Sequence, residues 1–353
     1  MKFDYYILNS YVPAADGDGP ELYRRWLEQV QTAEELGFGC AWFTEHHFEL
    51  FGGMMPNPQL FMAAATQRTR RIHLGTSVIL LPLHHPLRIA EDTAMLDVLS
   101  HGRLEVGVGR GMPHTPFALF GANPPTVQQQ LEEEIAILRT AWCQETFTWE
   151  GQFLRCSEPV TVRPRPVQQP HPPLWMTASR DPAHARWIGQ QRMSLMTLPW
   201  NLPSFDITRT LITEFRAGLH EAGLDERDRE VLAMYPAYVG ATPERARAEV
   251  SEHWSAFRQM GAALESGVGV IDRESLPYEQ VVRETRTVFG DAAMCRGHVD
   301  RIRSELDVDR LALLFHFGGL SQERVLASMR LFMERVAPAY VSEPIDSARM
   351  VQA

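Results

Sequence analysis

The sequence predicts an α/β protein, specifically a (β/α)8 TIM barrel with an inserted hairpin or lid region. Short apolar segments rich in β-branched residues alternate with helical segments, at roughly 30 residues per strand-helix unit. This alternation is typical of a parallel sheet, and eight apolar segments favour a closed barrel over an open doubly wound sheet. We therefore expect residues 1–353 to form one domain.

Composition supports this prediction and excludes other classes of protein. The chain has 353 residues, of which 44% are hydrophobic and 22% charged, so a large core can form. A net charge of −10 disfavours a nucleic-acid partner. The four cysteines form no CxxC pair, and the N-terminus and apolar runs predict neither a signal peptide nor a membrane span. We expect a cytoplasmic protein.

The strands and helices follow from the periodicity of apolar side chains. The predicted strands cover residues 3–8, 40–43, 72–81, 104–108, 174–177, 194–198, 231–239 and 310–317. The predicted helices cover residues 21–36, 59–69, 86–99, 127–142, 182–190, 205–222, 242–259, 299–305 and 322–336. Gly37, for example, ends a helix in which Leu22, Trp26, Val30 and Ala33 recur at helical spacing.

Two segments interrupt the regular alternation. Residues 148–173 combine alternating polar and apolar residues with many prolines, which predicts an inserted hairpin or extended lid. Residues 261–291 form the least regular region, and we interpret them as a mobile loop.

Three ionisable residues, Glu45, His46 and His47, follow the apolar strand at residues 40–43. In a (β/α) barrel, catalytic residues lie at the C-terminal ends of the strands. Adjacent strand residues point to opposite sides, so we expect at most one of the two histidines to face a given cavity. The other histidine would have a structural role.

A glycine-rich run at residues 107–111 ends the fourth predicted strand and carries Arg110. Glycines let the backbone approach a ligand closely, and an arginine offers two parallel donors to a phosphate. A tight turn with Arg110 in a surface ion pair is the alternative interpretation.

A second candidate anion site lies at residues 177–180, where Ser179 and Arg180 precede a helix. The alternative there is ordinary helix capping by Ser179 or Asp181. If Arg110 and Arg180 both point into the barrel mouth, they form one phosphate site.

Small residues at 75–78 would allow a flat ring to lie across the barrel mouth, although the spacing alone favours plain strand packing. No histidine, cysteine or acidic spacing is typical of a metal site. A nucleophile elbow for a Ser-His-Asp triad is also absent from the sequence.

Four segments resemble the bacterial luciferase-like flavin monooxygenases, among them the luciferase α-subunit. They are AWFTEHHFELFG at 41–52, residues 74–111, LWMTAS at 174–179 and SMRLFMERVAPAY at 328–340. The resemblance implies a TIM barrel that uses reduced FMN (FMNH2), supplied by a separate NAD(P)H:flavin reductase, together with O2. It also implies a dimer, which we expect to be a homodimer.

The resemblance assigns a role to each candidate residue. His46 matches the catalytic histidine, Arg110 the phosphate-binding arginine, and Ser179 and Arg180 the second phosphate-binding segment. Ser77 and Val78 match a non-proline cis peptide that supports the isoalloxazine ring. We expect the apolar residues Phe3, Trp42, Phe48 and Trp200 to line the barrel mouth, with the last three in the substrate pocket.

One departure from the family pattern concerns its catalytic Asp, which is Pro116 in this chain. We therefore expect, rather than light emission, oxygenation of an organic substrate through a flavin C4a-(hydro)peroxide, by carbonyl oxidation, Baeyer–Villiger insertion or hydroxylation. Two alternatives remain. The first is a deazaflavin (F420)-dependent oxidoreductase, and the second is a non-catalytic flavin-binding partner subunit.

Overall fold

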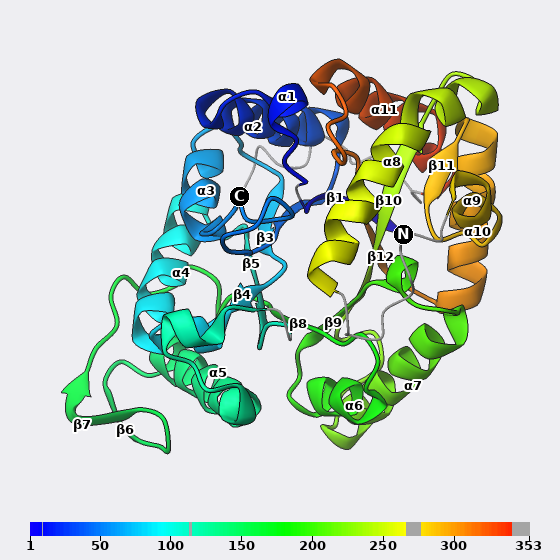
Figure 1. Ribbon diagram of the computed structural model, residues 1–353. Coiled ribbons are helices and arrows are strands. Elements are labelled where there is room, and N and C mark those ends of the chain that lie inside the picture. The colour runs from blue at the N-terminus through cyan, green and yellow to red at the C-terminus, as the bar shows by residue number, and fades with distance from the viewer. Residues whose placement is uncertain (9, 113–114, 266–276, 341–353) are drawn as a thin grey trace, which may run out of the picture.

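The computed structural model describes residues 1–8, 10–112, 115–265 and 277–340 and shows a closed barrel of parallel strands (Figure 1). The barrel strands are β1 (Lys2–Ile7), β2 (Cys40–Phe43), β3 (His73–Thr76), β5 (Leu104–Gly109), β8 (Leu174–Thr177), β9 (Ser194–Thr197), β10 (Val231–Val239) and β12 (Arg310–Leu314). They pair in the order β10-β12-β1-β2-β3-β5-β8-β9, and β9 pairs with β10 to close the barrel. The predicted TIM barrel is confirmed.

Helices surround the barrel, as Figure 1 shows. They are α2 (Gly19–Leu36), α3 (Pro58–Thr66), α4 (Pro86–Ser100), α5 (Val127–Cys143), α6 (Pro182–Gln190), α7 (Phe205–Glu221), α8 (Pro243–Glu265), α10 (Ala292–Leu306) and α11 (Gln322–Arg335), with the short α1 (Pro13–Asp16) and α9 (Tyr278–Arg283). Within the described residues, no helix combines the length and apolar character that crossing a membrane requires.

The segment predicted as one strand at residues 72–81 is divided in two. The peptide bond between Ser77 and Val78 is cis, and the chain leaves β3 at that bond. It continues as β4 (Ile79–Leu80), which pairs with the end of β5. The cis bond therefore lies at the C-terminal end of the barrel.

The insertion is an antiparallel hairpin of β6 (Phe147–Glu150) and β7 (Arg155–Val160). Glu133 on α5 holds its turn, because the carboxylate accepts N–H bonds from Gln152, Phe153 and Leu154 at 2.7, 3.0 and 2.9 Å. The hairpin projects from one edge of the molecule (Figure 1). The predicted hairpin is confirmed, but none of its residues lines the cavity described below, so it is not a lid over that cavity.

The segment interpreted as a mobile loop is largely regular where the structure describes it. Residues 261–265 continue α8, and residues after 276 form α9 and β11 (Val288–Gly290), a strand that pairs in parallel with β10. The prediction missed these elements because they are short. The remainder of that prediction, residues 266–276, lies outside the described residues.

Buried charges fill the N-terminal half of the barrel interior. The Arg310 guanidinium donates to the Asp4 carboxylate at 2.7 and 3.2 Å, and its carbon lies 5.7 Å from the centre of the Trp42 ring. Trp42 is completely buried and donates its indole N–H to Asp4 at 2.9 Å. A Cβ at Gly75 would lie 2.2 Å from the Trp42 ring. The small residue at position 75 therefore makes room for Trp42 rather than for a ligand.

Candidate active site

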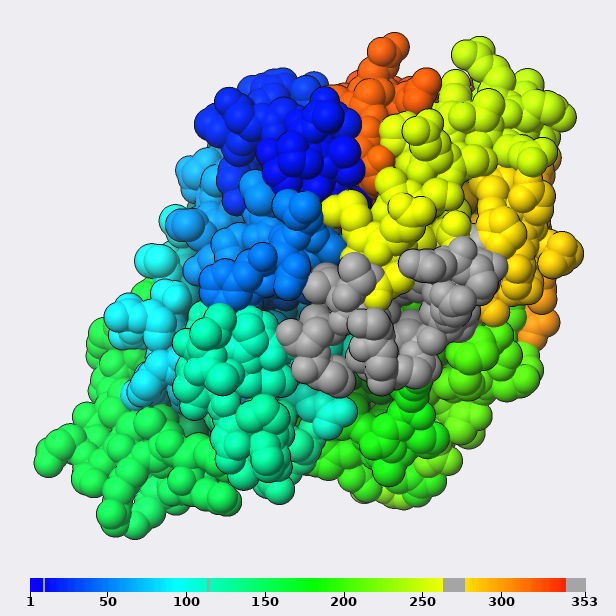
Figure 2. Space-filling model, viewed as in Figure 1, coloured from blue at the N-terminus to red at the C-terminus, as the bar shows by residue number. Residues whose placement is uncertain are grey.

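A cavity of about 1130 Å³ opens at the C-terminal ends of the barrel strands. Its wall includes residues at the ends of β2, β3, β5, β8 and β9 or within two positions of those ends. On the molecular surface, the loop after β2 (medium blue) and the segment before α5 (teal) lie side by side (Figure 2). Phe48 and Phe120 join these two segments, with stacked rings 5.9 Å apart.

Both histidines of the Glu45-His46-His47 run line this cavity. The expectation that only one would do so was wrong, because β2 ends at Phe43 and the histidines lie on a loop without strand alternation. The His46 ring contacts Phe51 edge-on at 6.4 Å. A Cβ at Gly52 would lie 2.5 Å from His46 Cγ, so the absence of a side chain there creates space for the imidazole.

Glu45 lies beside the histidines as a fully buried carboxylate. Its Oε1 accepts hydrogen bonds from Nε2 of His47 at 3.0 Å and of His84 at 2.7 Å, and its Oε2 accepts the Leu80 N–H at 3.0 Å. Burial alone would raise the pKa of Glu45, but the hydrogen bonds from the two histidines outweigh it and lower the pKa. The carboxylate is therefore ionised.

The contact with Glu45 also shifts the pKa of His84. Burial would lower its pKa, but the hydrogen bond to Glu45 and the charge of that carboxylate raise the pKa above its usual value. His84 was not singled out from the sequence, so this cluster was missed. Acidic and histidine residues at the ends of two neighbouring strands were the available signal.

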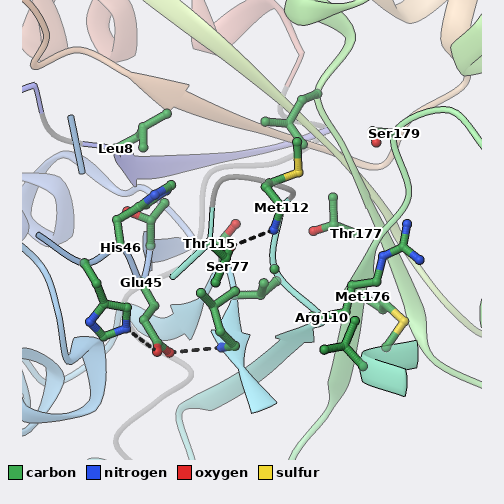
Figure 3. A pocket seen from close by; sticks show the side chains of 18 of the residues that line it. Leu8, Glu45, His46, Ser77, Arg110, Met112, Thr115, Met176, Thr177 and Ser179 are labelled. Atoms are coloured by element: carbon green, nitrogen blue, oxygen red, sulfur yellow. Dashed lines mark hydrogen bonds and ion pairs between the residues drawn. The ribbon is translucent and has the colours of Figure 1, made fainter. Parts of the chain in front are cut away.

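Arg110 lies on the other side of the cavity from Glu45 and His46, as Figure 3 shows. Its Nη1 makes one long hydrogen bond to Gln128 Oε1 at 3.4 Å. Burial lowers the pKa of the neighbouring His184, and the positive charge of Arg110 lowers it further. Among the residues described, no carboxylate forms an ion pair with Arg110, which is exposed and lines the cavity.

The segment after β8 brings Ser179 and Arg180 to the same cavity. The N-cap of α6 is Asp181, whose Oδ1 accepts the Ala183 N–H at 2.9 Å. Of the two residues considered for capping, Asp181 does so, and the Ser179 hydroxyl lines the cavity on the side of Arg110 (Figure 3). The structure thus brings together both predicted anion-binding segments.

The remaining wall is largely apolar, and its central members are Leu8, Val78, Met176, Leu198, Trp200 and Met234. Trp200 packs against Phe257 at 5.9 Å, while Phe48 lies at the cavity surface with 70% of its area exposed. Phe48 and Trp200 therefore line the cavity, as the sequence analysis expected.

Two residues expected at the barrel mouth lie elsewhere. Trp42 is enclosed inside the barrel between Asp4 and Trp175, where its ring contacts the Trp175 ring at 5.2 Å. Phe3 packs against Phe332 of α11, outside the barrel. Both predictions were wrong, because the apolar pattern of β1 and β2 does not reveal which side chain points into the cavity.

Pro116 lines the cavity, so this position provides no carboxylate. The acidic residues of the described lining are Glu45, Glu49 and Asp181. Of these, Glu45 is the one hydrogen-bonded to a cavity histidine in the described contacts.

The fold and the site together define a TIM-barrel enzyme with an apolar cavity at the C-terminal end of its barrel, bordered by arginines and histidines. The sequence model of the luciferase-like monooxygenases matches residues 1–303, and the chain belongs to this family. The resemblance found in the sequence is confirmed, and the family relationship makes the protein an oxidoreductase.

Individual relatives extend the match over nearly the whole chain. The oxygenase component of a flavin-dependent trigonelline monooxygenase from Acinetobacter baylyi is 26% identical, over 92% of each chain. An F420-dependent glucose-6-phosphate dehydrogenase from Nakamurella multipartita is 30% identical, over 93% of this chain and 95% of that protein. The crystal structure of the monooxygenase RslO1 from Streptomyces bottropensis superposes with a TM-score of 0.89 at 29% identity, covering 97% of this chain and all of that one.

Proposed function

We propose that this protein is the oxygenase of a two-component, FMN-dependent monooxygenase. It would take FMNH2 from an NAD(P)H:flavin reductase and use O2 to oxygenate an organic substrate through a flavin C4a-(hydro)peroxide. The observation that carries the proposal is the convergence of Arg110, residues 179–180 and His46 on one cavity beside the cis bond at residues 77–78.

The donors on the Arg110 side suit the phosphate of FMN. Two arginines and a serine hydroxyl line this side, and the N-terminus of α6 follows at Pro182. Guanidinium groups and helix N-termini both favour a bound phosphate. Arg110, Ser179 and Arg180 would hold this group.

The middle of the cavity suits a flat ring. Ser77 and Val78 form its floor at the cis peptide, and Met176 and Met234 are part of the wall. A typical pocket for one small molecule measures about 300–1,000 Å³. At about 1130 Å³, this cavity has room for a cofactor and an organic substrate together.

Reduced flavin supplies the activation of O2, and the protein supplies position, water exclusion and proton transfer. The apolar wall around Leu198 and Trp200 would exclude water from the reacting atoms. His46 would act as general acid or base while oxygen passes to the substrate. We propose carbonyl oxidation, Baeyer–Villiger insertion or hydroxylation as the reaction.

The test starts from protein saturated anaerobically with FMNH2 and mixed with O2 in a stopped-flow instrument. We expect the transient absorbance of the C4a-hydroperoxide, followed by oxygenated product with a panel of aldehydes and cyclic ketones. His46→Ala should bind FMNH2 but release hydrogen peroxide in place of product. His220→Ala, on the exposed end of α7, is the control. Unchanged product formation in His46→Ala would remove His46 from the mechanism.

A deazaflavin-dependent oxidoreductase is the second candidate, because a relative of nearly full length is named as F420-dependent. A deazaflavin-dependent enzyme would reduce or oxidise its substrate with F420 under nitrogen. With FMNH2 in air, it would form no oxygenated flavin. A non-catalytic partner subunit would bind flavin without turnover in either assay.

We also propose a homodimer. Exposed apolar side chains lie on α3 and α4, helices that pack against each other. They are Leu60, Met95, Val98 and Leu99. Such a face is covered in many dimers. Sedimentation equilibrium should give twice the monomer mass of 40.1 kDa, and Leu60→Glu combined with Met95→Glu should shift it to the monomer.

A further inference from the structure

The two adjacent histidines of the cavity differ in their surroundings. We propose that Glu45 is a positioning residue that holds His47 as its Nε2–H tautomer and that His47 serves, through Nδ1, as a second acid–base group of the cavity beside His46. The tautomer follows from the contacts of the ionised Glu45 carboxylate, whereas the acid–base role rests on the proposed function.

The contacts of Glu45 determine where the protons lie. Its side chain has no exposed area, and it accepts from His47 Nε2 at 3.0 Å, His84 Nε2 at 2.7 Å and the Leu80 N–H at 3.0 Å. An ionised carboxylate only accepts hydrogen bonds. Both imidazoles must therefore carry a proton on Nε2 to make these contacts.

With Nε2 protonated, the neutral His47 ring keeps its lone pair on Nδ1. The ring is held in place by Phe120, whose centre lies 4.7 Å away, and by Phe48 at 5.8 Å. Its side chain is 8% exposed and borders the cavity. The basic nitrogen thus belongs to a fixed ring at the cavity wall, which is the arrangement that acid–base catalysis requires.

His84 is the second histidine bonded to Glu45, and it does not border the cavity. Its side chain is 23% exposed, and the charges that face it come from Glu45, Glu134 and Asp92. Glu45 therefore connects the loop after β2 to the segment after the cis bond. Through this connection, one carboxylate orients a cavity histidine and fixes residues 80–84 against it.

Because position 116 is a proline, a carboxylate partner for a cavity histidine must come from another position, such as Glu45. In a catalytic triad, a carboxylate partner holds the histidine in one tautomer and stabilises its protonated form. Position 116 offers no carboxylate, whereas Glu45 lies within hydrogen-bond distance of His47. The local sequence Glu45-His46-His47 thus contains both members of a carboxylate–histidine pair, two residues apart.

The tautomer is tested by NMR on protein labelled with ¹⁵N-histidine, without flavin. Two-bond ¹H–¹⁵N correlations distinguish Nε2–H from Nδ1–H rings, and His47→Asn and His84→Asn assign the two signals. At pH 8 we expect Nε2–H patterns for both residues. An Nδ1–H pattern for His47 in the unmodified protein would overturn the proposal, and this result needs no variant at Glu45.

Glu45→Gln tests whether Glu45 determines the tautomers of His47 and His84. The amide has one accepting oxygen in place of two. It accepts either from the two imidazoles, which leaves the Leu80 N–H opposite an NH2 group, or from Leu80, which leaves both imidazoles opposite a donor. Either the Leu80 amide signal or the tautomer patterns of the rings should therefore change. The pKa of His84 should fall, because the charge and the hydrogen bond of the carboxylate are what raise it. Glu49→Gln, an exposed acid on the same cavity wall, is the matched control and should change neither signal. Unchanged rings together with an unchanged Leu80 amide signal in Glu45→Gln would contradict the positioning role.

The acid–base role is tested by turnover with FMNH2. His47→Gln should keep its affinity for FMNH2, lose about 10²-fold or more in product formation, and lose one limb of the pH–rate profile. A normal rate and profile would refute the acid–base role and leave the tautomer result standing. If the unmodified protein oxygenates nothing, the proposed function and the acid–base role fail together, while the NMR result still decides the tautomer.

Discussion

The two ends of the barrel both bury charge, but they arrange it differently. In the N-terminal half, Arg310 is enclosed by Asp4 and Glu230 at 2.7 and 3.1 Å, with the Trp42 ring packed beside it. At the C-terminal end, Arg110 makes one long hydrogen bond and faces a cavity. The N-terminal arginine is paired with carboxylates, whereas the arginine at the cavity has no ion-pair partner among the described residues.

This difference predicts that charges in the N-terminal half of the barrel serve stability and that charges at the cavity serve function. A buried ion pair that loses one partner leaves an uncompensated charge, so the N-terminal cluster tolerates little change. A charge beside a cavity keeps contact with water until a ligand replaces it. Substitutions in the first region should therefore act on folding, and substitutions in the second should act on binding and turnover.

Asp4→Asn should have the largest effect. It removes the main counter-charge of Arg310, and we expect the free energy of unfolding to fall by about 3–5 kcal/mol in urea denaturation. Glu150→Gln, in an exposed pair with Arg155, is the control and should change it by less than about 0.5 kcal/mol. A loss below about 1 kcal/mol for Asp4→Asn would show that the N-terminal cluster is not a stability element.

Glu134→Gln should stabilise the protein at alkaline pH. Burial raises the pKa of Glu134 to about 7, although the Gln130 hydrogen bond opposes the shift, and its Oε2 is buried without a partner among the described residues. The native state thus binds a proton that the unfolded state releases near pH 4.5, so stability falls as pH rises from about 4.5 to 7.

In Glu134→Gln, no group at this position ionises, so the fall in stability with rising pH that Glu134 causes is removed. We expect it to be more stable than the unmodified protein by about 1–3 kcal/mol at pH 8 and nearly equal to it at pH 4. Unfolding curves at the two pH values measure the difference. Equal stability at pH 8 would mean that Glu134 ionises without cost in the native state.

Phe48→Ala should have the smallest effect on stability. Phe48 is 70% exposed at the cavity end, so we expect a change of less than about 0.5 kcal/mol in the free energy of unfolding. Binding of apolar substrates should weaken instead, because Phe48 lines the cavity. A loss of 2 kcal/mol or more would place Phe48 among the stabilising residues and weaken the contrast between the two ends.

The sequence predicted the barrel because alternating strands and helices leave a periodic pattern that does not depend on tertiary detail. It also placed Arg110, Ser179 and His46 correctly at strand ends, since those positions follow from the order of elements alone. Trp42 was misplaced, because all four residues of β2 are buried and the strand shows no alternation. The Glu45–His84 contact was missed because it joins residues 39 positions apart.

The measurement that tests the account most directly is anaerobic binding of FMNH2 and of reduced riboflavin, which lacks the phosphate, to three proteins. For Arg110→Ala we expect the Kd for FMNH2 to rise about 10–100-fold, as the loss of a charge-assisted hydrogen bond predicts, with riboflavin binding unchanged. Arg155→Ala, on the exposed hairpin, should bind like the unmodified protein. Equal FMNH2 affinity in Arg110→Ala and the unmodified protein would contradict the proposal that the C-terminal end of the barrel holds a flavin phosphate.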